Sequence, residues 1–300
     1  MLTSIKRFAI SQLDRLAQAL PHNAKYYLLT HSLTPAHNGV SLNREQLAYI
    51  YIRGEGLELG ALNNPLPVSS HAHVKYVDFA TAEAVAEQFP GHAVKTPDIV
   101  DDAVTLNSVE DCSQDFVIAC HILEHLEDPI GAIKTWFRVL KPGGVLFMSI
   151  PDRRFTFDFN RRVTPLAHLF ADHEQGPAWS RAAHLKELEN EYRSTYQVQD
   201  DEVLDLLMNW QREGRGHTHF HVWTQLEMLE LMLALRRSAI SFDFECFCAY
   251  GIEGTFVLRK GSQEGSDVAE KSLQQARVEM AELIQSMRPN GSNAKGVSER

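Results

Sequence analysis

Small and acidic residues stand at the ends of three short apolar runs in the first half of the chain: Glu58, Gly60, Asp78, Asp102 and Ala103. A glycine after the first run lets a ligand lie against the backbone without meeting a Cβ. Asp78 follows Glu58 by twenty residues, a spacing at which a carboxylate can accept both hydroxyl protons of a ribose. A carboxylate followed by a free backbone N–H, as in Asp102-Ala103, can pair with the amino group and a ring nitrogen of adenine. These residues predict a site for an adenosine-containing cofactor.

Residues able to take up a proton follow the later apolar runs. His125 lies shortly after the fourth run, Asp152 comes just after the fifth, and His219 lies further along the chain. Each could serve as a general base for a hydroxyl acceptor, and the sequence compels none of the three. The charged residues that could bind a polar acceptor are Arg154, Asp158 and Arg161. The alternative for these is a solvated surface with internal salt bridges.

Strands and helices that would position these residues alternate from about residue 54 onward. The expected strands are 57–59, 74–78, 99–100, 116–120, 145–150, 242–250 and 255–259. The expected helices are 81–89, 128–140, 202–213 and 224–237. This alternation predicts an α/β fold with a mostly parallel sheet. Because ligands bind beyond the carboxyl ends of parallel strands, the candidate residues should gather at one edge of the sheet.

The composition and hydrophobic pattern of the sequence divide the chain into five parts. We expect a helical N-terminal cap, a cofactor-binding core, an α-rich insert on the acceptor side, a closing helix with a strand pair, and a helical then disordered tail. The corresponding ranges are 1–53, 54–150, 151–223, 224–260 and 261–300. The tail helix, expected over 273–287, could pair with a second copy of the chain or with an assembly partner.

Three segments of the core resemble class I S-adenosylmethionine-dependent methyltransferases, and within them the group that methylates small molecules. They are the run from Asp115 to His125, the pair Asp128-Pro129, and the run from Arg138 to Gly144. The run from His219 to Thr224 is similar to the entry of that family's late helix. The resemblance implies a Rossmann-like, seven-stranded sheet with the last strand antiparallel and helices on both faces.

The same resemblance implies S-adenosylmethionine as the cofactor and in-line methyl transfer to a small-molecule acceptor, such as a sugar, a lipid head group or another metabolite. The cofactor contacts that it implies are Glu58, Gly60, Asp78, Asp102, Ala103, Cys120 and His121. One departure concerns the first loop, which has fewer glycines than the family usually has. With Pro65 and Pro67 in that loop, the first helix should be short or distorted.

Two other functions remain as alternatives. An NAD-linked oxidoreductase is disfavoured, because the turn after the first strand lacks the glycines that admit a pyrophosphate to a helix N-terminus. A cofactor-binding scaffold without transfer activity would make use of the tail helix. A zinc peptidase is a weaker reading of His121-Ile-Leu-Glu-His125, because its first histidine follows a strand and the helix begins only after Asp128.

We expect no metal site. The alternating residues His217, His219 and His221 would point one way in an extended segment, but no neighbouring cysteine or carboxylate pair completes a ligand set. The pair Cys246-x-Cys248 has no partner pair at the spacing of a zinc site.

The composition limits the kinds of partner and the cellular location that we expect for this chain. The 300 residues carry 29 basic and 39 acidic side chains, a net charge of −10, which disfavours nucleic acid as the acceptor. Charged residues interrupt the first fifteen positions, so we expect no secretory signal, and no run has the length of a membrane span. The four cysteines suggest no disulfide framework. A cytoplasmic location is the expectation that follows.

Overall fold

The computed structural model describes residues 43–81, 83–84, 94–212, 218–238 and 240–261. Several sequence predictions lie outside the described residues: most of the helical cap over 1–53, most of the helix over 81–89, and the tail from 262 onward with its helix over 273–287.

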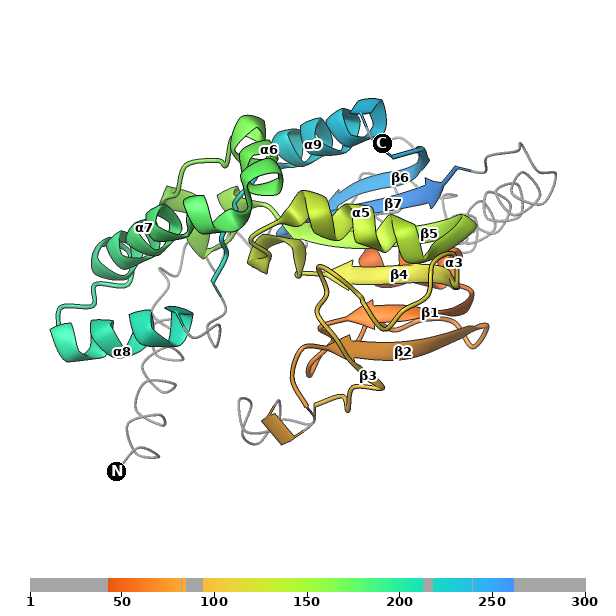
Figure 1. The fold of residues 1–300 in the computed structure, drawn as a ribbon, viewed down its shortest axis with the longest axis horizontal. Helices are drawn as coiled ribbons and strands as arrows, with labels where there is room; N and C mark the ends of the chain where they lie inside the picture. The colour runs from red at the N-terminus through yellow and green to blue at the C-terminus, as the bar shows by residue number, and fades with distance from the viewer. Residues whose placement is uncertain (1–42, 82, 85–93, 213–217, 239, 262–300) are drawn as a thin grey trace, which may run out of the picture.

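The described residues form a seven-stranded sheet with the strand order β3-β2-β1-β4-β5-β7-β6 (Figure 1). The strands are β1 (Gly54–Leu59), β2 (Ala72–Asp78), β3 (Ile99–Val100), β4 (Gln114–Cys120), β5 (Leu140–Pro151), β6 (Phe242–Tyr250) and β7 (Glu253–Lys260). The strands from β1 to β5 pair in parallel, whereas β7 is antiparallel to both β5 and β6. The expected α/β class, with a mostly parallel sheet and an antiparallel last strand, is confirmed.

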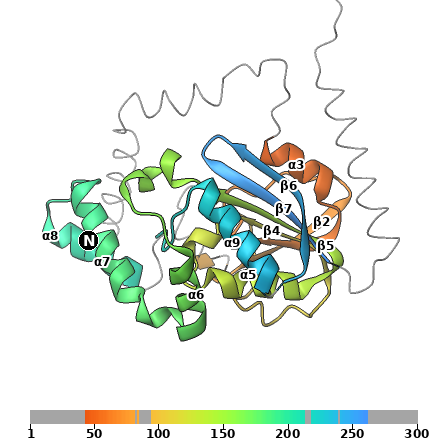
Figure 2. The ribbon, with the colours of Figure 1, turned by 90° about the horizontal axis from the view of Figure 1, so that it is seen from above.

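Helices cover both faces of this sheet, as Figure 2 shows. On one face α3 (Arg44–Tyr51) packs on the side chains of Phe116 and Ile118 in β4. On the other face α5 (Pro129–Val139) and α9 (Gln225–Ser238) pack on the alternate side chains of the same strand, Val117 and Ala119. Successive side chains of a strand point to opposite faces, so a strand with a continuous apolar run, like residues 116–120 of β4, needs cover on both faces.

The start of α5 follows from local chemistry. The side chain of Asp128 accepts a hydrogen bond of 2.8 Å from the backbone N–H of Gly131, and Pro129 takes the first helical position. An N-cap carboxylate satisfies one of the donors that a helix leaves unpaired, and proline is tolerated where no N–H is needed. The expected helix over 128–140 is therefore found within one residue at each end.

No helix forms between β1 and β2, where residues 60–71 are all described. Pro65 and Pro67 lack the N–H groups that a helix would need, and Leu62 adopts a positive φ of 47°. The expected short or distorted first helix is replaced by an irregular loop, which leaves the carboxyl end of β1 open.

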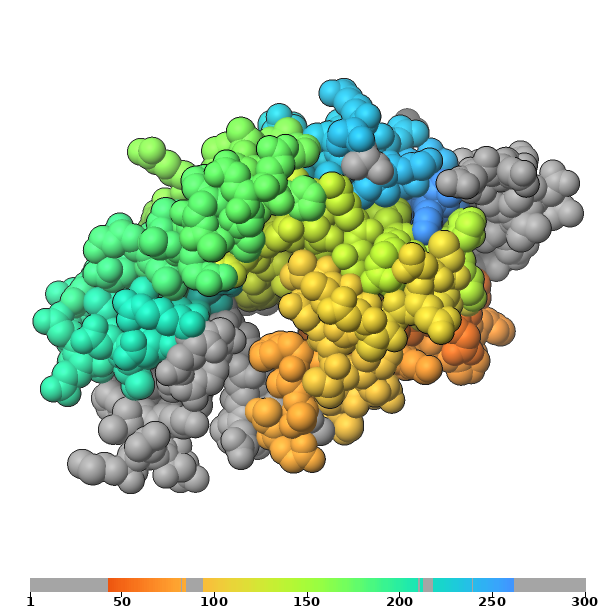
Figure 3. Space-filling view, viewed as in Figure 1, coloured from red at the N-terminus to blue at the C-terminus, as the bar shows by residue number. Residues whose placement is uncertain are grey.

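The insert between β5 and α9 contains three helices: α6 (Leu166–Gln175), α7 (Arg181–Ser194) and α8 (Asp201–Arg212). It has a small apolar cluster of its own between α7 and α8, which includes Leu188, Tyr192 and Leu207. Figure 3 shows the insert as a lobe beside the core. The sequence predicted α8 over 202–213, whereas α6 and α7 had no predicted bounds within the α-rich insert.

Candidate functional site

A cavity of about 750 Å³ opens at the carboxyl ends of β1 and β4. Four of the predicted cofactor residues line it: Glu58, Gly60, Cys120 and His121. Residues from the other end of the sequence complete the wall, among them the turn between β6 and β7. The irregular loop after β1 forms one side, so the absence of a first helix contributes to the opening.

Gly60 could not be replaced by a larger residue without a change in the loop. Its φ is +57°, a conformation that L-residues seldom adopt, and an added Cβ would collide with the Cδ1 of Ile122. The cavity wall at this point is therefore backbone, as the sequence predicted.

Glu58 is buried and only half satisfied. Its Oε1 accepts a hydrogen bond of 2.8 Å from the N–H of Leu66, whereas its Oε2 has no partner among the described residues. Burial raises the pKa of this carboxyl to about 7, against the lowering effect of the bond from Leu66. An unsatisfied carboxylate oxygen in a cavity wall is a place where a ligand donor can bind.

His121 is held between two carboxylates. Its Nε2 lies 2.6 Å from Oε2 of Glu253, and its Nδ1 lies 3.5 Å from Oε1 of Glu124. Burial opposes the charged form, but hydrogen bonds and charges from Glu124 and Glu253 outweigh it and raise the pKa of His121 to about 9. The ring is therefore an imidazolium at neutral pH. Its φ of 55° is a backbone outlier of the kind that clusters at functional sites.

Arg44 and Glu253 are site residues that sequence reasoning missed. Arg44 begins α3, and its Nη1 donates to Oε2 of Glu253 over 3.0 Å. Glu253 begins β7 and so joins Arg44 to His121. These residues are far apart in the sequence and belong to different elements, so no local motif could have identified them.

Two of the three candidate bases, His125 and His219, come together beside the cavity. Their rings lie 4.8 Å apart in a T-shaped arrangement, and His125 lines the cavity. Nδ1 of His125 lies 2.9 Å from the carbonyl oxygen of Thr218, and Nδ1 of His219 lies 2.6 Å from Oδ2 of Asp158. Each ring is thus oriented through Nδ1, which leaves Nε2 as the nitrogen that can take up a proton.

Glu124 is fully buried and lies next to both histidines. Its Oε1 is 3.9 Å from Nε2 of both His125 and His219. Burial favours the neutral acid, but His121, whose Nδ1 lies 3.5 Å from Oε1, and the charges of His125 and His219 lower the pKa of Glu124 below its usual value. Glu124 lies inside the His-x-x-Glu-His run, and this run was the only signal in the sequence that could have identified it.

The third candidate base, Asp152, is fully buried and already engaged. Its carboxylate accepts bonds from the guanidinium of Arg154 at 2.6–3.2 Å and from the N–H of Gln225 at 3.2 Å. This geometry holds the start of α9 against the end of β5. Arg154 keeps about half of its side chain exposed, away from the residues that line the cavity.

Asp158 and Arg161 form a buried ion pair with an Oδ1–Nη1 distance of 2.9 Å. Arg161 also donates to the carbonyl oxygens of His219 and Phe220 at 2.6 and 3.3 Å. Burial raises the pKa of Asp158, but the hydrogen bonds and charges of His219 and Arg161 outweigh it and hold this pKa below its usual value. The pair therefore holds His219 at two points: Asp158 accepts from its ring, and Arg161 donates to its backbone carbonyl.

The remaining predicted cofactor residues, Asp78, Asp102 and Ala103, lie toward the β2–β3 side of the same sheet edge. Oδ1 of Asp78 accepts from the N–H of Ala80 at 3.0 Å, and Oδ1 of Asp102 accepts from the N–H of Val104 at 2.7 Å. They do not line the cavity described above. Leu59 pairs with Val77, so the carboxyl ends of β1 and β2, and with them Gly60 and Asp78, are adjacent.

Comparison with known proteins finds a family match over the core. Residues 54–148 match the family described as methyltransferase domain. No curated protein matches the chain. In the part of the chain that the structure describes, no helix is both long enough and apolar enough to cross a membrane.

Two solved structures with similar folds are described as methyltransferases. An S-adenosylmethionine-dependent methyltransferase from Methanosarcina mazei is 21% identical, covers 75% of this chain and 100% of its own, and has a TM-score of 0.39. A possible histamine N-methyltransferase from Thermotoga maritima is 17% identical over 71% of this chain and 88% of its own, with a TM-score of 0.37.

Proposed function

We propose that this chain is an S-adenosylmethionine-dependent methyltransferase that acts on a small-molecule acceptor, and the match of residues 54–148 to the methyltransferase domain family supports this proposal. The cavity at the carboxyl ends of β1 and β4, with His125 on its wall, is the observation that carries the proposal. Its volume of about 750 Å³ is in the range of small-ligand pockets.

The charges around the cavity suit the methionine end of the cofactor, which carries a carboxylate and an ammonium group. Arg44 and the His121 imidazolium are the cations for the carboxylate, and the unpaired Oε2 of Glu58 is an acceptor for the ammonium. Asp78 would accept the ribose hydroxyls, and Asp102 with Ala103 would bind the adenine. When bound, the cofactor supplies an electrophilic methyl group.

The chain itself has to orient the acceptor, exclude water and remove a proton where the nucleophile is a hydroxyl. We propose that Nε2 of His125 accepts this proton, because the ring lines the cavity and its Nδ1 lies against the carbonyl oxygen of Thr218. His219 packs against that ring and is itself held by Asp158, so it serves as a positioning residue. A histidine oriented by a carboxylate is a recurring arrangement for general bases and their supports.

The insert would build the acceptor side of the pocket. It supplies Asp158 and Arg161 behind His219, and it supplies Phe157, whose ring lies 4.7 Å from that of His219 and is 41% exposed. An exposed aromatic ring beside a histidine is a surface on which an acceptor can rest. We also propose that Arg154, whose side chain is about half exposed, contacts the acceptor.

The test is methyl transfer from isotopically labelled S-adenosylmethionine into the small-molecule and macromolecular fractions of a cell extract. We expect label in the small-molecule fraction with the wild-type chain, and about 10²–10⁴-fold less with His125→Gln. Cofactor affinity of that variant, measured by calorimetry, should be unchanged. His73→Gln, a change at an exposed histidine, is the matched control.

Three results would count against the proposal. Label confined to nucleic acid or protein would exclude a small-molecule acceptor. Cofactor binding without label in any fraction would favour a scaffold role. Full turnover by His125→Gln would remove His125 as the base.

A further inference from the structure

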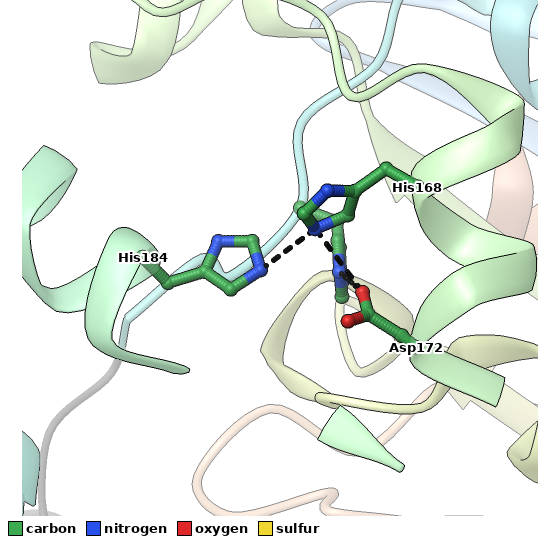
Figure 4. A group of neighbouring side chains, drawn as sticks. His168, Asp172 and His184 are labelled. Atoms are coloured by element: carbon green, nitrogen blue, oxygen red, sulfur yellow. Dashed lines mark hydrogen bonds and ion pairs between the residues drawn. The ribbon is translucent and has the colours of Figure 1, made fainter. Parts of the chain in front are cut away.

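Four side chains of the insert and the segment after it converge on one point. His168 and Asp172 lie one turn apart on α6, His184 lies on α7, and His221 lies in the extended segment before α9. Figure 4 shows His168, Asp172 and His184 pointing toward one another from the two helices. None of the four lines the cavity or belongs to the methyl-transfer site proposed above.

Three pairs of the converging atoms lie close to the spacing of ligands in a tetrahedral metal site. Nε2 of His168 lies 3.0 Å from Nε2 of His184 and 3.2 Å from Oδ2 of Asp172. Nε2 of His221 lies 2.9 Å from the same carboxylate oxygen, and all four atoms are within 4.8 Å of one another. Bonds of 2.0–2.1 Å to a tetrahedral zinc ion separate its ligands by about 3.3 Å.

These contacts place atoms with lone pairs against one another. A carbonyl oxygen can only accept, so Nδ1 of His221, 3.0 Å from the carbonyl of Leu126, carries the proton of that ring. In the neutral imidazole, its Nε2 then presents a lone pair to the Asp172 carboxylate. Between His168 and His184, the two facing Nε2 atoms can share one proton at most. A cation at the centre would be bound by all four lone pairs.

An outer set of hydrogen bonds orients two of the ligands. The hydroxyl of Ser180 donates to Oδ1 of Asp172 over 2.5 Å, which leaves Oδ2 for the centre, and the bond to Leu126 fixes the ring of His221. Metal-binding histidines and carboxylates typically have such supports. Asp172 and His221 are fully buried and His184 nearly so, and buried ionisable side chains are generally paired or coordinate a metal.

We propose that His168, Asp172, His184 and His221 bind a structural zinc ion. Nitrogen and oxygen ligands in a tetrahedral set of four suit Zn²⁺, and a site with four protein ligands leaves no open position for catalysis. The ion would fasten α6 and α7 to the segment before α9. This segment is joined to the loop after β4, since Phe220 N–H donates to the carbonyl of Glu124 over 2.8 Å. The zinc site thus stabilises the insert against the core.

A second group, Glu124, His125 and His219, also has ligand atoms within reach of one another. It offers three ligands rather than four, and its carboxylate oxygen is 3.9 Å from each Nε2. The first group is therefore the stronger candidate, and a test has to distinguish the two.

The experiment is elemental analysis of the full-length protein, produced with added zinc and purified through a tag without histidines. We expect one zinc ion per chain in the wild type and a loss of at least about tenfold in His184→Ala and Asp172→Asn. His173→Ala, next to Asp172 on α6 but paired with Asp128, is the matched control and should keep its zinc. His125→Ala should also keep it; zinc lost there and retained in His184→Ala would overturn the proposed location.

A second measurement needs no variant and so does not depend on how the variants fold. The wild-type protein is stripped with a chelator and titrated with Co²⁺, whose visible absorption is intense only in tetrahedral sites. We expect this absorption at one equivalent, its loss on addition of zinc, and a lower thermal midpoint for the stripped protein that zinc restores. No cobalt spectrum, together with zinc far below one equivalent in the untreated protein, would overturn the proposal.

Discussion

His121 and Glu253 are joined by a hydrogen bond of 2.6 Å between Nε2 and Oε2, which links the end of β4 to the start of β7 across the intervening strand β5. The bond brings a carboxylate from the carboxyl-terminal part of the core to the loop that follows β4. Together with Glu124, Glu253 raises the pKa of His121.

The first prediction concerns the pH dependence of stability. The pKa of His121 is raised to about 9, above its ordinary value of 6.5, so its contribution to stability is fully present below about pH 6.5 and is lost as the pH rises through about 9. His121→Asn, a residue that tolerates the positive φ, should reduce this loss by on the order of 1 kcal/mol or more. Urea unfolding at both ends of this window measures it.

The control for this experiment is His73→Asn, because His73 is exposed and its contact is with Glu55 rather than with the site. Its stability should follow the wild-type pH profile. An unchanged profile in His121→Asn would show that His121 is not the titrating group.

The second prediction concerns Gly60. Gly60→Ala should lower the thermal midpoint and weaken cofactor binding, because the new Cβ meets Ile122 and because the positive φ costs an L-residue about 1–2 kcal/mol. The double variant Gly60→Ala/Ile122→Ala should be more stable than the summed losses of the two single variants predict. Calorimetric unfolding of the four proteins gives this coupling; simple additivity would mean that the clash with Ile122 is absent.

The third prediction concerns Asp78. Asp78→Ala should weaken S-adenosylmethionine binding at least about tenfold, because losing a bidentate contact to the ribose costs about 1.5–3 kcal/mol. Asp98→Ala, which likewise removes a carboxylate that accepts one backbone N–H, is the matched control and should bind normally. Equal affinity of the two variants in titration calorimetry would contradict the assignment of Asp78.

The fourth prediction concerns the buried pair of Asp158 and Arg161. Asp158→Asn leaves the guanidinium without its buried partner and should destabilise the protein by about 3–5 kcal/mol. Replacing both residues, as in Asp158→Asn/Arg161→Met, should cost less than the sum of the single changes. Denaturant unfolding tests the cycle, and a double variant as unstable as that sum would exclude the coupling.

Much of the fold could be predicted from the sequence because it depends on local patterns. The alternation of side chains in β4, the N-cap at Asp128 and the prolines after β1 each act within a few residues. Such patterns specify the sheet edge at which Gly60, Cys120 and His121 line one cavity. Family resemblance over the core then indicated the cofactor.

The sequence alone could not predict which polar residues face a ligand and which face one another. Asp152, Asp158 and Arg161 have the composition of a binding surface, yet the first is buried against Arg154 and the other two form an internal pair. Whether a charged side chain is exposed depends on what packs over it. In the insert this is decided by contacts between segments that are distant in the sequence.

The proposed zinc ligands show the same division most clearly. His168 and Asp172 are four positions apart and share a helix face, which spacing alone predicts, but His184 and His221 follow at intervals of twelve and thirty-seven residues. The sequence determined that each segment would form its helix or extended strand and which side chains each would carry. The four ligand atoms meet at one point only because α6 packs against α7 and the segment before α9 packs against the loop after β4. That convergence depends on where whole elements lie relative to one another, and the spacing within any one element does not determine it.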